Sequence, residues 1–203
     1  KDPAALKVVV TGRIAPSKGQ DEAARAVGEL NKAGLPTELR IIGTPAQPEH
    51  MNTLNNVIAD YDIADKVHLL GHQSNPLSIV RHADVGIMAS HQEAFGRVTF
   101  EYMTAGKPVV GANSGATPEL IKDNVNGFLY KKNDLNDLIK QLRKYATDRE
   151  VIDEHGKQAR KRAEAMMTGE CTADSLFERL QTELAHFDKK RPLHFSRKWL
   201  DYP

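Results

Sequence analysis

The chain has 203 residues, of which 40% are hydrophobic and 27% are charged, and its formal net charge is +1. These values are ordinary for a globular protein, and the length suits one large α/β domain better than two. A charge so near zero creates no overall field that would attract nucleic acid or an anionic membrane, so any anion site must come from local geometry. The single cysteine excludes an internal disulfide and fits a reducing, cytoplasmic location.

Short apolar runs alternate with helical patterns along the chain, which is typical of a parallel sheet covered by helices on both faces. In chain order we predict strand 6–11, helix 17–33, strand 39–42, helix 49–60, strand 67–70, short helix 77–82, strand 85–88, helix 96–105, strand 108–111, edge strand 127–130 and a helical region from 134 to about 187. The predicted fold is α/β, a doubly wound, Rossmann-like domain over residues 4–187. Residues 188–203 are interpreted as a C-terminal tail.

Glycines follow several of the predicted strands. Gly12, Gly43 and Gly71 come directly after the first three strands. Turn geometry explains any one of these glycines. In doubly wound sheets, however, ligands bind outside the carboxyl ends of the strands, where these loops meet. Several glycines at one edge, beside charged residues, therefore indicate a site for an anionic ligand.

The loop over residues 12–19 carries two cations, Arg13 and Lys18, at the start of a predicted helix. It is neither a P-loop, which needs glycine directly before the lysine, nor a G-x-G-x-x-G dinucleotide fingerprint. Two cations beside free helix amides can bind a diphosphate without a metal ion. By the loop's sequence alone, a solvated arginine and lysine on the surface are about equally well supported.

Two glutamates, Glu93 and Glu101, are separated by seven residues at the head of the predicted helix 96–105. Eight helical steps span ~12 Å, so the two carboxylates are too far apart to share a proton. They can instead bind opposite ends of one ligand, with the amides of Phe95, Gly96 and Arg97 facing a phosphate between them. Spacing alone favours the simpler interpretation that both are ordinary helix acids.

These motifs together resemble the family 4 glycosyltransferases, which are retaining enzymes of the two-domain GT-B type. The resemblance covers roughly residues 6–145 in the family's order. It rests on the 12–19 loop, on E-x7-E, and on Val67-His68-Leu69-Leu70-Gly71, Ala83-Asp84-Val85, Ala105-Gly106-Lys107-Pro108-Val109-Val110-Gly111, Pro118-Glu119-Leu120-Ile121 and Asn126-Gly127-Phe128-Leu129. It implies that the chain is the donor-binding half of a hexosyltransferase-type enzyme that moves a sugar from a nucleoside-diphosphate sugar to a saccharide, lipid or protein acceptor.

The resemblance also assigns roles to residues. Arg13 and Lys18 match the basic pair that binds the donor diphosphate and stabilises its charge as the sugar leaves. Glu101 matches the carboxylate that accepts hydrogen bonds from the ribose. Glu93 matches the one that faces the donor sugar and stabilises positive charge at the anomeric carbon. The other implied donor-binding residues are Gly12, Gly43, Thr44, Gly71, His72, Gln73, Ala94, Phe95, Gly96, Arg97 and Val98. Of these, the two that follow Gly71 are expected nearest the base.

No cofactor and no metal ion is expected, because the family usually works without a divalent cation. Asp60-Tyr61-Asp62 has the D-x-D form of metal-dependent sugar transferases, but it lies at a predicted helix end away from the glycine-bearing loops. His68 and His72 lie on a strand and its turn, where they cannot pair as they would on a helix. With no third ligand indicated, zinc is not expected.

The family's acceptor-binding N-terminal domain is missing from this sequence, which opens on Lys1-Asp2-Pro3 as if at an engineered boundary. We therefore expect the chain to be inactive by itself and its tail, with Phe195 and Trp199, to dock on that domain. The mixture of cations and aromatics in the tail also leaves open a nucleic-acid or membrane patch. Peripheral association of the full-length enzyme with the inner face of the membrane is compatible with this pattern. Two alternative functions remain: a nucleotide-sugar-binding module without transfer, and a sugar-nucleotide epimerase of the GT-B fold.

Overall fold

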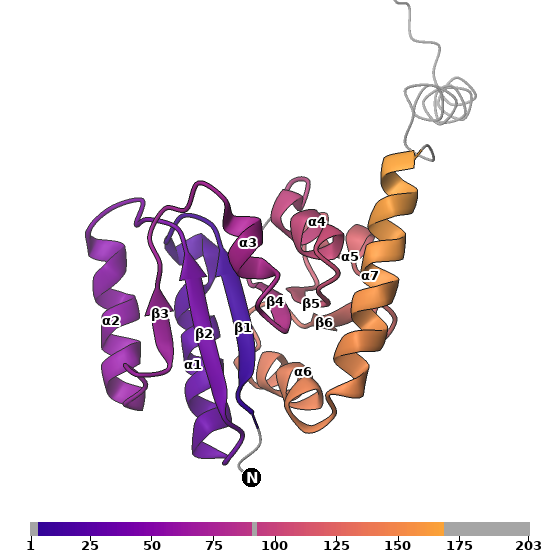
Figure 1. Ribbon diagram of the computed structural model, residues 1–203. Coiled ribbons are helices and arrows are strands. Elements are labelled where there is room, and N and C mark those ends of the chain that lie inside the picture. Colours follow the sequence, from indigo (N-terminus) through magenta and orange to yellow (C-terminus); the bar gives the residue numbers. More distant parts are fainter. Residues whose placement is uncertain (1–3, 91–92, 169–203) are drawn as a thin grey trace, which may run out of the picture. The chain divides into compact units, whose positions relative to one another are not determined.

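A computed structural model describes residues 4–90 and 93–168. Within these ranges six parallel strands form one sheet in the order β3-β2-β1-β4-β5-β6 (Figure 1). The strands are β1 (Leu6–Thr11), β2 (Thr37–Ile42), β3 (Val67–Leu69), β4 (Val85–Met88), β5 (Val109–Ala112) and β6 (Gly127–Tyr130). The strand order reverses between β1 and β4, which confirms the predicted doubly wound fold. In sheets of this kind, ligands commonly bind outside the carboxyl ends of the strands where the order reverses.

Helices cover both faces of the sheet. They are η1 (Pro16–Lys18), α1 (Gln20–Lys32), α2 (Glu49–Tyr61), α3 (Pro76–Val80), α4 (Arg97–Thr104), α5 (Thr117–Leu120), α6 (Leu135–Thr147) and α7 (Glu150–Thr168). Helix α1 packs against α2 and α6 over one hydrophobic cluster, whereas α4 packs against α3, α5, β4 and β5 over a second. Because both faces are covered, the central strands are apolar almost throughout, as the continuous burial of β4 and β5 shows.

The chain divides into two compact units, residues 1–163 and 164–203. The first contains the whole sheet. Of the second, the structure describes residues 164–168, which are the last part of α7. The predicted boundary between residues 187 and 188, and the tail with Phe195 and Trp199, lie outside the described residues.

The predicted strands agree with the structure to within a residue or two, and the helices show three differences. The predicted helix 17–33 is divided by Gly19, whose left-handed backbone (φ 67°) separates η1 from α1. The described part of the helical region after residue 134 is two helices, because Asp148 is extended (φ −132°) and its carboxylate accepts from Glu150 N at 3.1 Å, starting α7. The short helix α5 was not predicted.

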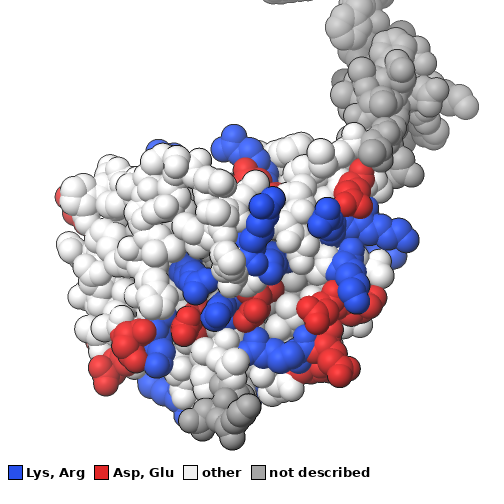
Figure 2. All heavy atoms as spheres, viewed as in Figure 1, with Lys and Arg blue, Asp and Glu red and all other residues white. Residues whose placement is uncertain are grey.

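Charged side chains of both signs are interspersed on the face seen in Figure 1, and no large field of one sign covers it (Figure 2). This agrees with a net charge of +1. No helix in residues 4–90 and 93–168 has the length and apolar character needed to cross a membrane.

Candidate functional site

The loops after β1, β2 and β3 are joined edge to edge by backbone hydrogen bonds. Gly12 N donates to Ile42 O at 2.9 Å, and Ile14 N donates to Thr44 O at 2.9 Å. Gly43 N in turn donates to Gly71 O at 2.8 Å. The three glycines predicted to lie at one edge therefore do lie in one bonded layer at the carboxyl ends of the strands.

Gly43 allows this layer to form. Its φ is 147°, and a Cβ added there would overlap the carbonyl oxygen of Gly12. A side chain would thus push the first two loops apart. The glycine is required by the close approach of two backbones, which is a different reason from the simple turn that its place after a strand suggests.

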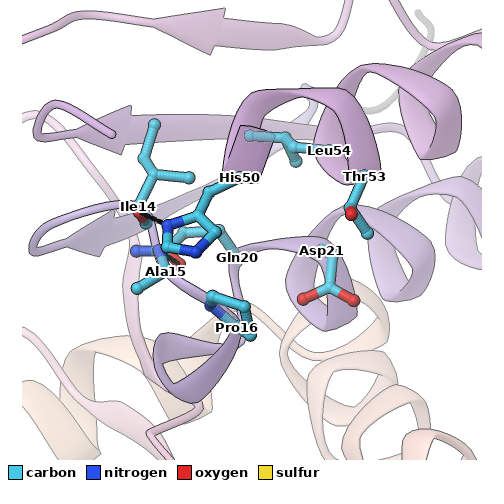
Figure 3. Close-up of a pocket in the computed structure, with 8 residues that line it drawn as sticks. All are labelled: Ile14, Ala15, Pro16, Gln20, Asp21, His50, Thr53 and Leu54. Atoms are coloured by element: carbon cyan, nitrogen blue, oxygen red, sulfur yellow. Dashed lines mark hydrogen bonds between the residues drawn. The ribbon is translucent and has the colours of Figure 1, made fainter. Parts of the chain in front are cut away.

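The loop that carries Arg13 is held from below by two side chains. Gln20, at the start of α1, is 1% exposed, and its Nε2 donates to Arg13 O at 2.9 Å while its Oε1 accepts from Ala15 N at 3.4 Å. His50, in the first turn of α2, places Nδ1 3.3 Å from Ile14 O, as Figure 3 shows. These contacts fix the backbone at Arg13 and at the two residues that follow it, whereas the Arg13 side chain is exposed.

A cavity of about 290 Å³ lies beneath this loop, between the starts of α1 and α2 (Figure 3). Its lining residues are Ile14, Ala15, Pro16, Gln20, Asp21, His50, Thr53 and Leu54. Arg13, Lys18 and the two glutamates of E-x7-E are not among them. The cavity therefore lies between this loop and the starts of α1 and α2, and the predicted charged groups do not line it.

Lys18 and Glu93 form an ion pair, although 75 residues separate them in the sequence. Lys18 Nζ lies 3.0 Å from Glu93 Oε2, and the two side chains are 37% and 20% exposed. The cation comes from the segment after β1 and the carboxylate from the loop after β4, so the pair joins these two segments at the point where the strand order reverses. The structure thus brings together two of the three predicted catalytic residues.

The backbone of Glu93 is fixed by the loop after β5. Ala116 N donates to Glu93 O at 2.9 Å, and Gly115 (φ 56°) lies so close that a Cβ there would overlap the same carbonyl oxygen. Neither residue was identified from the sequence. Their effect is to hold the backbone of Glu93 against the loop after β5.

Helix α4 carries Glu101 and starts at Gly96, its left-handed N-cap (φ 76°). The helix is anchored by Tyr102, whose hydroxyl donates to Val9 O at 3.4 Å across the top of Gly86, where a Cβ would overlap the ring. Burial raises the pKa of Tyr102 far above its ordinary value, so the hydroxyl stays protonated and can donate. Glu101, half-buried in the middle of the helix, is therefore set on a firmly attached element, whereas Glu93 belongs to the preceding loop.

The remaining predicted binding residues lie on these loops or in the first turn of α4. Five of them are exposed: Thr44, His72, Ala94, Phe95 and Arg97. The aromatic side chain of Phe95 is 72% exposed. Val98 and Gln73 are half-buried. The Gln73 amide donates to Leu70 O at 2.6 Å, so part of its hydrogen-bonding capacity is used to close its own loop.

The acidic tripeptide Asp60-Tyr61-Asp62 lies at the end of α2, shortly before β3 begins. It is therefore near the amino ends of the strands, whereas the glycine loops follow their carboxyl ends, as predicted. Within the described parts of the chain, no three histidine, cysteine, aspartate or glutamate side chains are grouped so that they could hold a metal ion. His68 instead faces Glu38, with Nε2 3.9 Å from the carboxylate.

Comparison with known proteins identifies the family. Residues 1–162 match the family described as glycosyl transferases, group 1. The chain belongs to the group 1 glycosyl transferases. The narrower assignment to family 4 stays a prediction.

Two bacterial proteins illustrate the relationship of this group 1 domain to longer chains. It is 30% identical over 191 residues to a D-inositol 3-phosphate glycosyltransferase of Saccharomonospora viridis, covering 90% of this chain and 44% of that protein. It is 35% identical over 133 residues to the protein of the same name from Mycolicibacterium gilvum, covering 63% of this chain and 29% of that protein. The chain thus spans less than half the length of these relatives.

Solved structures share the fold. The crystal structure of HepE from Anabaena in complex with UDP superposes with a TM-score of 0.75 at 23% identity, over 90% of this chain and 50% of that one. The C-terminal domain of the group 1 protein LpcC from Francisella tularensis superposes with a TM-score of 0.73 at 22% identity, over 79% of this chain and 85% of that domain. At these levels of sequence identity, the comparison shows that the folds are alike and nothing further.

Proposed function

We propose that this chain is the donor-binding part of a retaining glycosyltransferase and binds a nucleoside-diphosphate sugar in the crevice between the β1 and β4 loops. The observation that carries the proposal is the Lys18–Glu93 pair at 3.0 Å, which sets a cation and a carboxylate side by side at the point where the strand order reverses. HepE, which shares the fold, has been crystallised with UDP and with UDP-glucose.

The proposed chemistry is departure of a nucleoside diphosphate from the anomeric carbon of a sugar. The leaving group gains negative charge, and preorganised cations and amides are what such a transition state requires. Arg13 and Lys18 supply the cations, and the backbone of residues 94–98, at the start of α4, supplies the amides. Glu93 faces the sugar, where its carboxylate stabilises positive charge at the anomeric carbon. Glu101 accepts hydrogen bonds from the ribose hydroxyls.

Neither metal nor cofactor is part of this proposal, because both charges on the diphosphate are met by side chains. The acceptor is expected to be bound by another part of a longer protein, since the relatives are more than twice the length of the matched segment. The chain by itself should therefore bind the donor without transferring the sugar, because the two substrates are not held together.

A donor screen tests the proposal. The chain is heated in EDTA with UDP-, ADP- and GDP-sugars, and its unfolding temperature is recorded. A donor present at a hundredfold its Kd should add ~2.7 kcal/mol of stability, which for a domain of this size raises Tm by roughly 5–10 °C. Lys18→Ala should remove most of that shift. The proposal fails if no nucleotide sugar raises Tm, or if Lys18→Ala responds as the wild type does.

A further inference from the structure

The Lys18–Glu93 pair should affect the relative affinities of different phosphate ligands that bind beside it. Without a ligand, Lys18, which we propose binds phosphate, is already paired with the Glu93 carboxylate at 3.0 Å. A phosphate that approaches Lys18 therefore meets Glu93 as well. Attraction and repulsion act on it from two groups a few ångströms apart.

Glu93 is the more fixed of the two partners. Its side chain is 20% exposed, against 37% for Lys18, and its carbonyl accepts from Ala116 N at 2.9 Å in a loop packed tightly on Gly115. Lys18 ends the short helix η1 on a long, flexible side chain and can turn from the carboxylate to a phosphate oxygen. The negative charge of Glu93 consequently stays at the crevice when Lys18 moves.

We propose that Glu93 makes this site discriminate against the free nucleoside diphosphate and in favour of the nucleoside-diphosphate sugar. The inference rests on the proposed function. A free diphosphate carries about one more negative charge at neutral pH than its sugar ester, because a terminal phosphate loses its second proton near pH ~6. That additional charge lies on the end that faces Glu93, where it is repelled.

The sugar ester reverses the interaction. Its terminal phosphate has no second ionisation, and the sugar lies between that phosphate and Glu93. The sugar hydroxyls can donate hydrogen bonds to the carboxylate, and bonds to a charged acceptor are stronger than neutral ones. One carboxylate thus favours the donor and disfavours the diphosphate product, which helps the product to leave after transfer.

The test compares two ligands on the same chain by calorimetry in EDTA. The first pair is UDP and UDP-glucose; ADP with ADP-glucose and GDP with GDP-glucose are the second and third. Glu93→Gln removes the charge and keeps the size, and Glu93→Ala serves as a second neutral variant. Glu49→Gln is the matched control, since Glu49 is an exposed acid on α2, after the β2 loop at the same edge of the sheet.

Glu93→Gln should tighten UDP about three- to tenfold by relieving charge repulsion at a partly exposed site. The same variant should leave UDP-glucose unchanged or weaken it. The gain for UDP should shrink in high salt, which screens charge, and Glu49→Gln should leave both affinities as they are.

The inference is overturned if Glu93→Gln and Glu93→Ala change both affinities by the same factor, or if they weaken UDP more than UDP-glucose. A different outcome identifies failure of the proposed function: the wild-type chain would then bind none of the three pairs. In that case the inference falls with it.

Discussion

Replacing Gln20 by leucine tests how the Arg13 loop is held. The substitution replaces a polar side chain by an apolar one of similar size at a position that is 1% exposed. It removes the bond to Arg13 O at 2.9 Å, worth about 1 kcal/mol, and the longer bond from Ala15 N at 3.4 Å, worth less. The expected loss of unfolding free energy is about 1–2 kcal/mol, or roughly 2–8 °C in Tm for a domain of this size.

The same substitution should also affect ligand binding selectively. With its backbone less fixed, Arg13 is less preorganised for phosphate, so UDP should bind about three- to fivefold more weakly. Uridine, which lacks the diphosphate, should bind as before. Urea unfolding followed by circular dichroism gives the stability, and calorimetry gives the two affinities.

A matched control is Gln158→Leu. Gln158 Nε2 donates to Glu154 Oε1 at 3.0 Å on an exposed face of α7, so its loss should change stability by no more than about 0.5 kcal/mol. If Gln20→Leu is as mild as this control, the two loop bonds contribute nothing. If it lowers stability but changes UDP and uridine affinity equally, Gln20 supports the fold without positioning Arg13.

Three further predictions follow from single residues. Gly43→Ala should lower the free energy of unfolding in urea by about 2–4 kcal/mol, because the alanine Cβ would overlap the Gly12 carbonyl oxygen. Gly34→Ala is the control: Gly34 has φ 74° but open space around it, so the loss should be about 1 kcal/mol. Equal losses would refute the close approach of the two backbones at Gly43. Glu101→Ala should weaken uridine and UDP by the same factor, about five- to tenfold in calorimetry, by removing the ribose acceptor; a loss confined to UDP would contradict that role. His155 is 6% exposed, its Nδ1 lies 2.8 Å from the Tyr145 hydroxyl, and burial lowers its pKa. The unfolded chain therefore takes up the proton at a higher pH than the folded chain does, and the free energy of unfolding should fall as pH drops through ~6.5. Part of that fall should be missing in His155→Gln when urea unfolding is compared at pH 7.5 and 5.5, and an undiminished fall would show that other groups cause it.

The sheet could be predicted because its information is local. The strands are short and mostly apolar, β1 and β2 are followed directly by glycines, and β4 was predicted over the same residues that form it, 85–88. The division of the first helix at Gly19 was missed, since a glycine inside a helical pattern is often tolerated there. Packing also requires a glycine at this position, because a Cβ would approach Ala89 to 2.6 Å.

The sequence could indicate where the candidate site residues lie on the sheet, but not how they contact one another; their role in binding a donor stays a prediction. The sequence indicated that Lys18 and Glu93 share an edge of the sheet, but their pairing depends on how the loops after β1 and β4 approach each other. Gln20, His50 and Gly115 were overlooked for the same reason. Gln20 bonds to the backbone of the loop directly before it, whereas His50 and Gly115 contact the backbone of other loops, and no sequence spacing indicates these contacts.

The most direct test of the account is calorimetric titration of UDP and uridine into the wild-type chain, Arg13→Ala and Lys18→Ala, all in EDTA. Each lost charge-assisted bond should weaken UDP by ~1.5–3 kcal/mol and leave uridine nearly unchanged. That result would place the diphosphate between the two cations without a metal ion. Unchanged UDP affinity in both variants would contradict the diphosphate site on which the proposed function depends.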